Sequence, residues 1–391
     1  MGARSLSLEA TCQLQDARTA RWDVIVVGAG VAGTMAAIGL ARLGRRVMLV
    51  DKAGFPRNKV CGGCMNLRAL GVLQQAGLGD LLARLGGVPL ETFQLSTDRR
   101  CAIVAMPGGM AVSRYRLDES LIRVAIENGV QFTDHCSASL LPPSPDCRVL
   151  RLQRKNEAVD VEASIVLAAD GLHSSLLRRS GEVAATVASD ARIGAGILLE
   201  DDRNVFLPGR IYMATGEWGY VGITRVEDGK LDVAAALDTG ALRTFGGPGP
   251  LVAQMLRANG LPLPAGASGG AWQGTPPLTR QTARPGAERV FALGDAAGYV
   301  EPFTGEGMAW ALSAGQAVVP HADAGIAAWT PAVLASWTAE YSRCVVQRQW
   351  ICKGLAAVLR RPVLTDCAVR LLAWQPGLAR PILNRISAAA P

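Results

Sequence analysis

The chain has 391 residues, of which 49% are hydrophobic and 19% charged, so it can bury a sizeable core in two domains or in one large domain with insertions. Its net charge of +7 comes largely from bases near the C-terminus that alternate with Leu, Val and Trp, and we expect no nucleic-acid partner. Nine cysteines without a preceding signal peptide indicate reduced thiols in a cytoplasmic protein.

The N-terminal residues carry no structural pattern before position 22. Residues 1–21 mix charged and polar side chains without an apolar run and are expected to be a flexible leader. Residues 24–41 carry no charge, so a membrane span is an alternative for them. Three glycines early in that stretch and the arginines directly after it favour a nucleotide-binding turn instead.

The most informative motif is the glycine-rich turn after the first expected strand, Val24 to Val27. Gly28 permits the turn, Gly30 lets the backbone approach a pyrophosphate, and Gly33 lets the next helix pack closely on the strand. That helix would direct its free N–H groups at phosphates. Asp51 ends the second strand, where a carboxylate accepts hydrogen bonds from ribose hydroxyls. Strand, turn, helix, strand and acid together predict dinucleotide binding.

The later elements predict an α/β protein with a Rossmann-like domain, an inserted antiparallel β-sheet domain and a helical C-terminus. Helices are expected at 67–85, 118–128 and from 307 onward, and buried strands near 130, 165 and 290. The domains predicted from this order are a dinucleotide-binding domain of two segments, a substrate domain and C-terminal helices, at 22–180 with 285–325, 181–284 and 326–391. Part of 88–112 is expected to join the substrate sheet.

Two further motifs follow buried strands. The first is Asp170-Gly171. The second, Gly294-Asp295, opens a glycine-rich loop that ends at the start of a helix. Asp295 is placed at a strand end where it can hold a ribityl hydroxyl, and the N–H groups of that helix start form an electropositive cradle. Its residues are Gly305, Gly307 and Met308.

Together the three motifs resemble the FAD-dependent oxidoreductases of the p-hydroxybenzoate hydroxylase fold, over about residues 22–320. The most similar branch contains geranylgeranyl reductases and flavin-dependent halogenases. The resemblance implies FAD, with Asp295 at its ribityl-phosphate part and the glycine motif with Asp51 at its ADP part. Arg114 matches the family arginine that reaches the cofactor from a helix start. Asp170 and Gly171 match a motif that serves FAD and NAD(P)H, although Leu177 stands where the family usually has arginine.

Catalytic candidates lie in two of these loops. Cys61, in Lys-Val-Cys-Gly-Gly-Cys, matches a cysteine that lies near the flavin in the reductase branch, and its basic neighbours suggest a lowered pKa. A redox dithiol with Cys64 and simple packing under the ring remain alternatives, while zinc lacks a second ligand pair. Glu306 is a candidate for proton handling, with a non-catalytic loop carboxylate as its alternative. No metal site is expected.

Substrate contacts are expected from aromatic residues on the sheet that would cover the flavin and in the glycine loop, although ordinary sheet packing is the alternative. The candidates are Tyr212, Trp218, Tyr220 and Phe303.

The resemblance implies an NAD(P)H-dependent monooxygenase acting on a hydrophobic or phenolic small molecule such as a secondary metabolite. A geranylgeranyl-reductase-like enzyme that reduces C=C bonds of an isoprenoid or lipid is the alternative. A halogenase is disfavoured because the Trp-x-Trp-x-Ile-Pro motif is absent, and the intact motifs argue against a scaffold without chemistry.

The basic C-terminal helices suggest two partners besides the substrate. Eight Lys or Arg against two Asp or Glu give residues 340–391 a net charge of +6. A peripheral contact with an anionic membrane, or with an acidic carrier protein, is an alternative to an ordinary solvated helix face.

Overall fold

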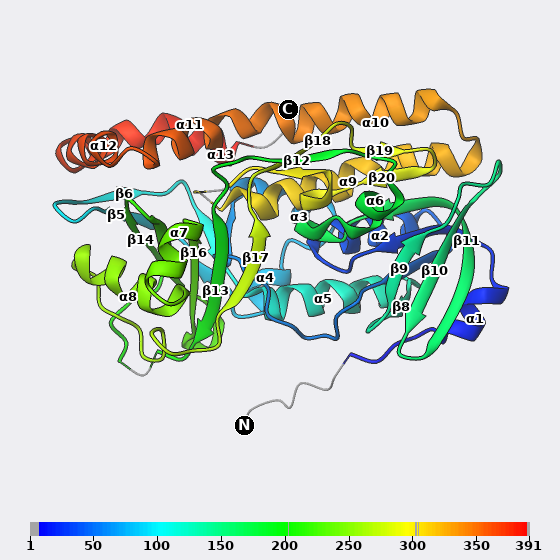
Figure 1. Ribbon diagram of the computed structural model, residues 1–391, viewed down its shortest axis with the longest axis horizontal. Coiled ribbons are helices and arrows are strands. Elements are labelled where there is room, and N and C mark those ends of the chain that lie inside the picture. The colour runs from blue at the N-terminus through cyan, green and yellow to red at the C-terminus, as the bar shows by residue number, and fades with distance from the viewer. Residues whose placement is uncertain (1–7, 202, 302, 304, 389–391) are drawn as a thin grey trace.

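A mainly parallel sheet forms one half of the molecule (Figure 1). The glycine motif follows an inner strand of this sheet, Trp22–Val27. The computed structural model describes residues 8–201, 203–301, 303 and 305–388. The parallel strands lie side by side in the order β20 (Val290–Ala292), β11 (Glu157–Ala168), β1 (Trp22–Val27), β2 (Val47–Val50), β8 (Gln131–Thr133). The central strands β1 and β2 are almost entirely buried, which explains their continuous apolar sequence. Antiparallel strands extend the sheet at β19 (Gly286–Ala287), β10 (Arg148–Arg154) and β9 (Ser137–Leu140).

Three long helices position the parallel sheet's loops. Helix α2 (Val31–Arg42) packs against both α9 (Glu306–Ala327) and α5 (Arg114–Glu127). The α2–α9 crossing is close, because a Cβ on Gly315 would lie 2.4 Å from the backbone oxygen of Ala32. The N-termini of all three helices lie near the carboxyl ends of the parallel strands, where they line a common cavity.

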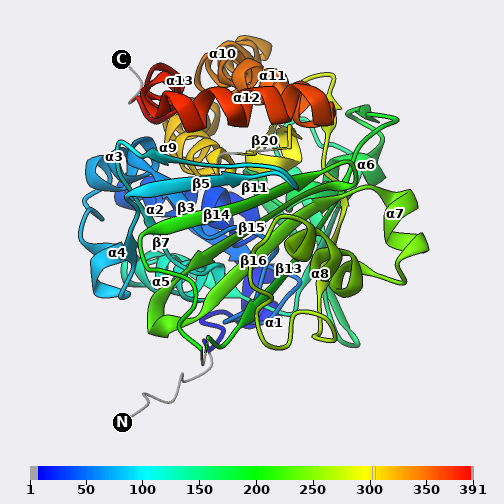
Figure 2. The same ribbon diagram turned by 90° about the vertical axis from the view of Figure 1, so that its left-hand side faces the viewer.

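A second sheet forms the other half of the molecule (Figure 2). Its strands lie in the order β17 (Gln273–Pro277), β13 (Ile193–Leu199), β16 (Leu231–Leu237), β15 (Gly219–Arg225), β14 (Arg210–Gly216), β5 (Thr92–Ser96), β6 (Cys101–Ala105). All neighbours pair antiparallel except β14 and β5. Helices α7 (Thr239–Thr244) and α8 (Pro248–Ala258) cover one face, and the opposite face turns toward the glycine loops.

The C-terminal helices form an outer layer that runs along one side of both sheets (Figures 1 and 2). They are α10 (Pro331–Cys344), α11 (Gln349–Leu359), α12 (Pro362–Trp374) and α13 (Arg380–Ser387). Helix α12 packs across β6. Smaller elements connect these layers: β3 (Cys64–Asn66), α3 (Leu67–Gln75), α4 (Leu81–Arg84), β4 (Val88–Pro89), β7 (Gly109–Ala111), α6 (Ser175–Ser180), β12 (Ala185–Val187), β18 (Arg280–Thr282) and β21 (Gly298–Tyr299).

The predicted fold class is confirmed, but the expectation of a flexible leader is wrong for residues 8–21. Helix α1 (Leu14–Thr19) buries Leu14 and Ala17 in the main core. The indole Nε1 of Trp22 donates a hydrogen bond to the Ala17 carbonyl at 3.0 Å. The apolar residues responsible are isolated in sequence and therefore give no periodic signal. Among the described residues, no helix is long and apolar enough to cross a bilayer, and residues 24–41 form a strand, a turn and α2.

Candidate active site

The glycine turn between β1 and α2 is so closely packed that side chains cannot be accommodated. Gly28 has a φ of +110°, and a Cβ there would lie 2.2 Å from the Ala169 backbone oxygen. A Cβ on Gly33 would lie 2.0 Å from the oxygen of Gly28. By contrast, a Cβ on Gly30 would meet no backbone and would point toward the side chains of Arg114 and Lys59. Gly28 and Gly33 thus fix the turn, and Gly30 leaves room above it.

Asp51 is held at the end of β2 beside this turn. It is buried, and its two carboxylate oxygens accept hydrogen bonds from the backbone N–H groups of Ala29 (2.8 Å) and Ala53 (2.9 Å). The guanidinium of Arg57 lies 3.5 Å from the same carboxylate. The carboxylate is therefore held in place, and its remaining lone pairs can accept hydrogen bonds from ribose hydroxyls.

Two cations face the N-terminus of α2. The Arg114 guanidinium, at the first turn of α5, binds both oxygens of Asp118 at 2.7 Å each, and both side chains are buried. The Lys59 ammonium lies 3.7 Å from the Asp295 carboxylate. Since α2 has no side-chain cap on its first N–H groups, this corner combines a helix N-terminus with two positive charges, which is suited to a pyrophosphate.

The second glycine-rich loop closes the same space from the opposite side. Gly294 and Asp295 begin a short helical turn after β20, and Gly305 is the N-cap of α9 with a φ of +74°. Gly307 and Met308 lie in the first turn of α9, and all five residues except Met308 are only partly buried. All five line one cavity together with Gly30, Arg114 and Gly171.

That cavity lies between the cofactor-type loops and the second sheet, whose wall is apolar. Ile211, Met213, Tyr220 and Phe303 line it, and so does Phe93. The Phe303 ring contacts the rings of Tyr220 and Phe93 at centroid distances of 5.1 and 5.8 Å. The site therefore offers a polar, cationic half to a nucleotide and an apolar half to a hydrophobic molecule.

The structure corrects two of the expected substrate residues. Tyr212 and Trp218 do not line the cavity; they belong to the cluster under α7 and α8 on the opposite face of the sheet. The Tyr212 hydroxyl accepts a hydrogen bond from Leu207 N–H, and the Trp218 ring contacts Phe245. Side chains alternate between faces along a strand, so Tyr212 points away from the cavity while its neighbours Ile211 and Met213 line it.

Cys61 and Cys64 lie at the boundary between the polar and apolar halves, and both are free thiols. The expected lowering of the Cys61 pKa by basic neighbours is wrong. Burial raises its pKa and outweighs the opposing effect of Arg114. Burial also raises the pKa of Cys64 to about 12, and its sulfur contacts the Gly62 carbonyl and the Thr224 hydroxyl. Both side chains therefore hold their protons at neutral pH.

Glu306 does not line this cavity, in contrast to its expected place beside the flavin ring. It is buried at the start of α9, and its carboxylate accepts a hydrogen bond from the Cys352 thiol of α11. Successive residues of a helix point in directions about 100° apart, so Gly307 and Met308 reach the cavity while Glu306 faces α11. Its contact is a link between α9 and the C-terminal helices.

Asp170 stabilises the chain locally. One of its oxygens accepts hydrogen bonds from the Ser175 hydroxyl and the Leu176 N–H, both at 2.9 Å, at the start of α6. Its other oxygen is buried without a protein partner. Gly171, with a φ of +74°, lines the cavity directly beside it. The motif thus positions backbone at the cavity wall and leaves one carboxylate oxygen available.

Two further charged residues of the site were not predicted to belong to it. Lys59, the first residue of the Lys-Val-Cys-Gly-Gly-Cys motif, contributes its ammonium to the cavity, and burial and Arg114 lower its pKa. Asp232 on β16 is buried near the Cys61–Cys64 loop, and burial raises its pKa well above the ordinary value. It lines a second cavity that also contains Lys59 and Arg114. A lone Asp in an otherwise apolar strand, Leu-Asp-Val-Ala-Ala-Ala-Leu, was the only available signal.

Comparisons with known proteins agree with this geometry. A model of the FAD binding domain matches residues 21–198. The menaquinone reductase of Mycobacterium tuberculosis is 28% identical over 321 residues, which cover 75% of this chain and 74% of that protein. The digeranylgeranylglycerophospholipid reductase of Methanothrix thermoacetophila is 26% identical over 308 residues, covering 75% and 76%.

The fold agrees with solved flavoproteins. A flavoprotein/dehydrogenase from Cytophaga hutchinsonii superposes with a TM-score of 0.79 at 17% identity, covering 94% of this chain and 93% of that one. The chain has the p-hydroxybenzoate hydroxylase fold, and residues 21–198 match an FAD binding domain. The two relatives, which each cover three quarters of the chain, are reductases, and the solved structure is a flavoprotein. The open space above Gly30, the two cations facing it and the fixed Asp51 fit the pyrophosphate and ribose of FAD.

Proposed function

We propose that this protein is an FAD-dependent oxidoreductase that reduces a carbon–carbon double bond in an isoprenoid-bearing or other lipid-like substrate. The observation that carries the proposal is the protonated Cys61 thiol, placed where the cofactor-type loops meet an apolar wall. Reduction of an isolated double bond needs a hydride at one carbon and a proton at the other. A thiol that keeps its proton at neutral pH is a suitable donor.

Bound FAD supplies the hydride in its reduced form, and NAD(P)H is the reductant that we infer for it. Arg114 and Lys59 neutralise the pyrophosphate, and the amide groups of the α2 N-terminus bind it. Asp51 holds the adenosine ribose, and Asp295 the ribityl chain. Gly305, Gly307 and Met308 place the α9 N-terminus at the end of the cavity, where it stabilises negative charge.

The proton leaves Sγ of Cys61 and forms the new C–H bond, which leaves a thiolate. The thiolate regains its proton from water after the product has left, because the raised pKa of Cys61 favours the thiol at neutral pH. Phe93, Tyr220 and Phe303 hold an apolar chain against this edge and exclude water.

The relatives support the substrate class. The two relatives described above are named as reductases, one of a quinone and one of a phospholipid with geranylgeranyl groups, and each spans about three quarters of the chain. An apolar pocket wall is what an isoprenoid chain requires.

Hydroxylation of a hydrophobic or phenolic molecule is the second candidate. It is favoured by the apolar, partly enclosed wall around Phe93 and Phe303, since oxygen insertion requires a site that excludes water. It needs no proton donor at carbon, and so leaves Cys61 without a chemical role.

The products distinguish the two candidates. The FAD-loaded enzyme would be incubated with NADPH or NADH and a menaquinone or geranylgeranyl lipid, and then with phenolic substrates, in air. Mass spectrometry of the products should show a gain of two hydrogen atoms for the reductase. A gain of one oxygen atom would establish the hydroxylase instead. Substrate-independent consumption of NAD(P)H alone would contradict both proposals.

Replacement of the proton donor gives a sharper test. Cys61→Ser should retain FAD but slow product formation by about 10²- to 10⁴-fold, the usual contribution of a positioned acid. Because burial raises the thiol pKa above its ordinary value, the wild-type rate should also show no loss from thiol ionisation near neutral pH. Cys101→Ser, at an exposed cysteine, is the control. Equal rates for both variants would leave Cys61 as a packing residue.

A further inference from the structure

The outermost surface of helix α12 is apolar. Thr365 and Val369 are buried on the face toward β6. On the opposite face, Val363, Leu371 and Trp374 have exposed fractions of 75%, 48% and 78%. These positions are separated by multiples of about one helical turn, so they form one continuous stripe. A helix normally turns such a stripe toward the core.

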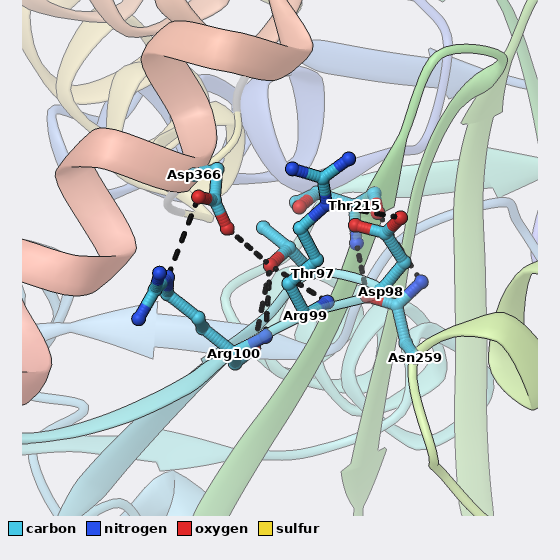
Figure 3. A network of polar contacts seen from close by, with 7 residues as sticks. All are labelled: Thr97, Asp98, Arg99, Arg100, Thr215, Asn259 and Asp366. Atoms are coloured by element: carbon cyan, nitrogen blue, oxygen red, sulfur yellow. Dashed lines mark hydrogen bonds and ion pairs between the residues drawn. The ribbon is translucent and has the colours of Figure 1, made fainter.

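The orientation of α12 is fixed by polar contacts on its inner side (Figure 3). Asp366 accepts a hydrogen bond from the Thr97 hydroxyl at 3.2 Å and lies 3.4 Å from the Arg100 guanidinium. Thr97 is anchored in turn by the backbone of the β5–β6 turn. The apolar stripe therefore cannot rotate inward without breaking this network.

Exposed apolar side chains concentrate on the same helical layer. Among the described residues, fourteen large hydrophobic side chains are exposed, and eight of them lie between positions 346 and 382, which is about a tenth of the chain. They are Val346, Trp350, Val363, Leu364, Leu371, Trp374, Leu378 and Ile382. Scattered exposed hydrophobics are normal, but such a concentration indicates an interaction surface.

Basic side chains are interspersed with this apolar surface. Arg361 and Arg370 are exposed on α12 or directly before it, and Lys353, Arg380 and Arg385 are exposed on α11 and α13. The Arg385 guanidinium lies over the Trp350 ring, 5.6 Å from its centroid. The two acids of residues 340–391 both pair with arginines, Glu340 with Arg343 and Asp366 with Arg100. The surface is therefore apolar and cationic at once.

We propose that α11, α12 and α13 dock on an anionic lipid bilayer, with Val363, Leu371 and Trp374 inserted into the interface. A helix lying in the interface combines an apolar face with Lys and Arg that contact anionic headgroups. Trp is favoured at headgroup depth, and long basic side chains can extend from the apolar layer to the phosphates. Nucleic acid would match the charge but not the apolar stripe.

The docking surface lies directly behind the wall of the active-site cavity. The inner faces of these helices contribute Leu359, Val369 and Leu383 to one apolar cluster that also contains Phe93 and Phe303. The bilayer proposal goes beyond the proposed reduction and does not depend on it. If both hold, a lipid substrate needs to cross only this cluster to move between membrane and cavity.

The test is sedimentation of the FAD-loaded full chain with vesicles of phosphatidylcholine, with and without phosphatidylglycerol. We expect binding that requires phosphatidylglycerol and weakens with salt. Val363→Ser with Trp374→Ser should weaken it by about tenfold or more per side chain. Arg361→Gln with Arg370→Gln should weaken it about fivefold per charge. Leu207→Ser and Arg257→Gln, at exposed positions elsewhere, are the matched controls.

Flavin content and melting temperature, unchanged in all variants, would show that the fold is retained. Vesicle binding that is absent, or that is equal for the α12 variants and the controls, would overturn the proposal. Concentration-dependent dimerisation that is lost in Val363→Ser with Trp374→Ser, without vesicle binding, would assign this surface to a second copy instead. Because vesicle binding is measured without substrate, its outcome is independent of the reductase test.

Discussion

At the scale of single residues, the sequence shows which charged residues are adjacent to a titratable group, but it does not show how deeply that group is buried. Cys61 follows two basic residues, which on their own would lower a thiol pKa. The loop folds against the second sheet, and the resulting desolvation raises the pKa instead. The contacts responsible come from β15 and β16, more than 150 residues away, and no local pattern contains them.

The reactivity of the cysteines should follow burial. With iodoacetamide near neutral pH, the exposed Cys101 and Cys367 should be alkylated first, and Cys61 and Cys64 slowly, because the thiolate is the reactive form. Peptide mass spectrometry over time measures the order. Labelling of Cys61 as fast as that of Cys367 would contradict the raised pKa.

Asp232 should make stability depend on pH. Burial raises the pKa of this carboxyl in the folded state well above its ordinary value, so the folded state retains the proton over a range in which the unfolded state has lost it. Stability then falls as pH rises from about 4 toward the folded pKa. Relative to Asp232→Asn, the wild type should lose about 1.4 kcal/mol per pH unit in that window.

Urea unfolding at about pH 5 and about pH 7 measures this difference. The variant serves as the reference, since every other titrating group is common to both proteins. Parallel changes in the two proteins would mean that Asp232 ionises normally and that its burial is relieved in solution.

At the scale of elements, the local motifs could be predicted from the sequence. Which face of a strand or helix points toward the cavity was harder to predict. The β1 turn, α2 and Asp51 follow from residues within about thirty positions of one another, and their geometry agrees with the prediction. Tyr212 lies on the opposite face from the predicted one, because the apolar residues of β14 continue on both sides of the strand. Glu306 lies outside the predicted site because it contacts Cys352 of α11, more than forty residues away.

The close contact of α2 with β1 should make Gly33 intolerant of any side chain. Gly33→Ala places a Cβ 2.0 Å from the backbone oxygen of Gly28, so we expect a loss of about 1–3 kcal/mol of unfolding free energy and weaker FAD binding. Gly71→Ala in α3 is the matched control, because its Cβ meets nothing within 4 Å. That change should stabilise the protein by about 0.5–1 kcal/mol.

Thermal unfolding and flavin retention on gel filtration measure both effects. Equal stability of the two variants would show that α2 can move away from β1 without penalty, and the close approach would then not be required by the fold.

At the scale of the whole molecule, the cavity proposed for FAD joins residues from both sheets and from α9. Bound FAD should therefore stabilise the entire chain by about 2.7 kcal/mol when free FAD is about 100 times its Kd. Asp295→Ala should lose most of this stabilisation and purify with little flavin. Asp323→Ala, which removes the carboxylate paired with Arg45 on the outer side of α9, is the control.

Melting curves at increasing FAD concentrations provide the measurement. A variant lacking Asp295 that melts and retains flavin like the Asp323 variant would remove Asp295 from the cofactor site.

The pairing of β20 with β11, which are more than 120 residues apart, also sets an order of events during synthesis. Strand β20 pairs directly with β11, although most of the second sheet lies between these two strands in the sequence. Asp295 follows β20 by three residues. A ribosome must therefore complete about three quarters of the 391 residues before the last cofactor-binding loop exists. Until then the apolar edge of β11 next to β20 stays uncovered in the nascent chain. We therefore expect FAD to bind only near the end of translation. Chains terminated before residue 290 should depend on chaperones for solubility.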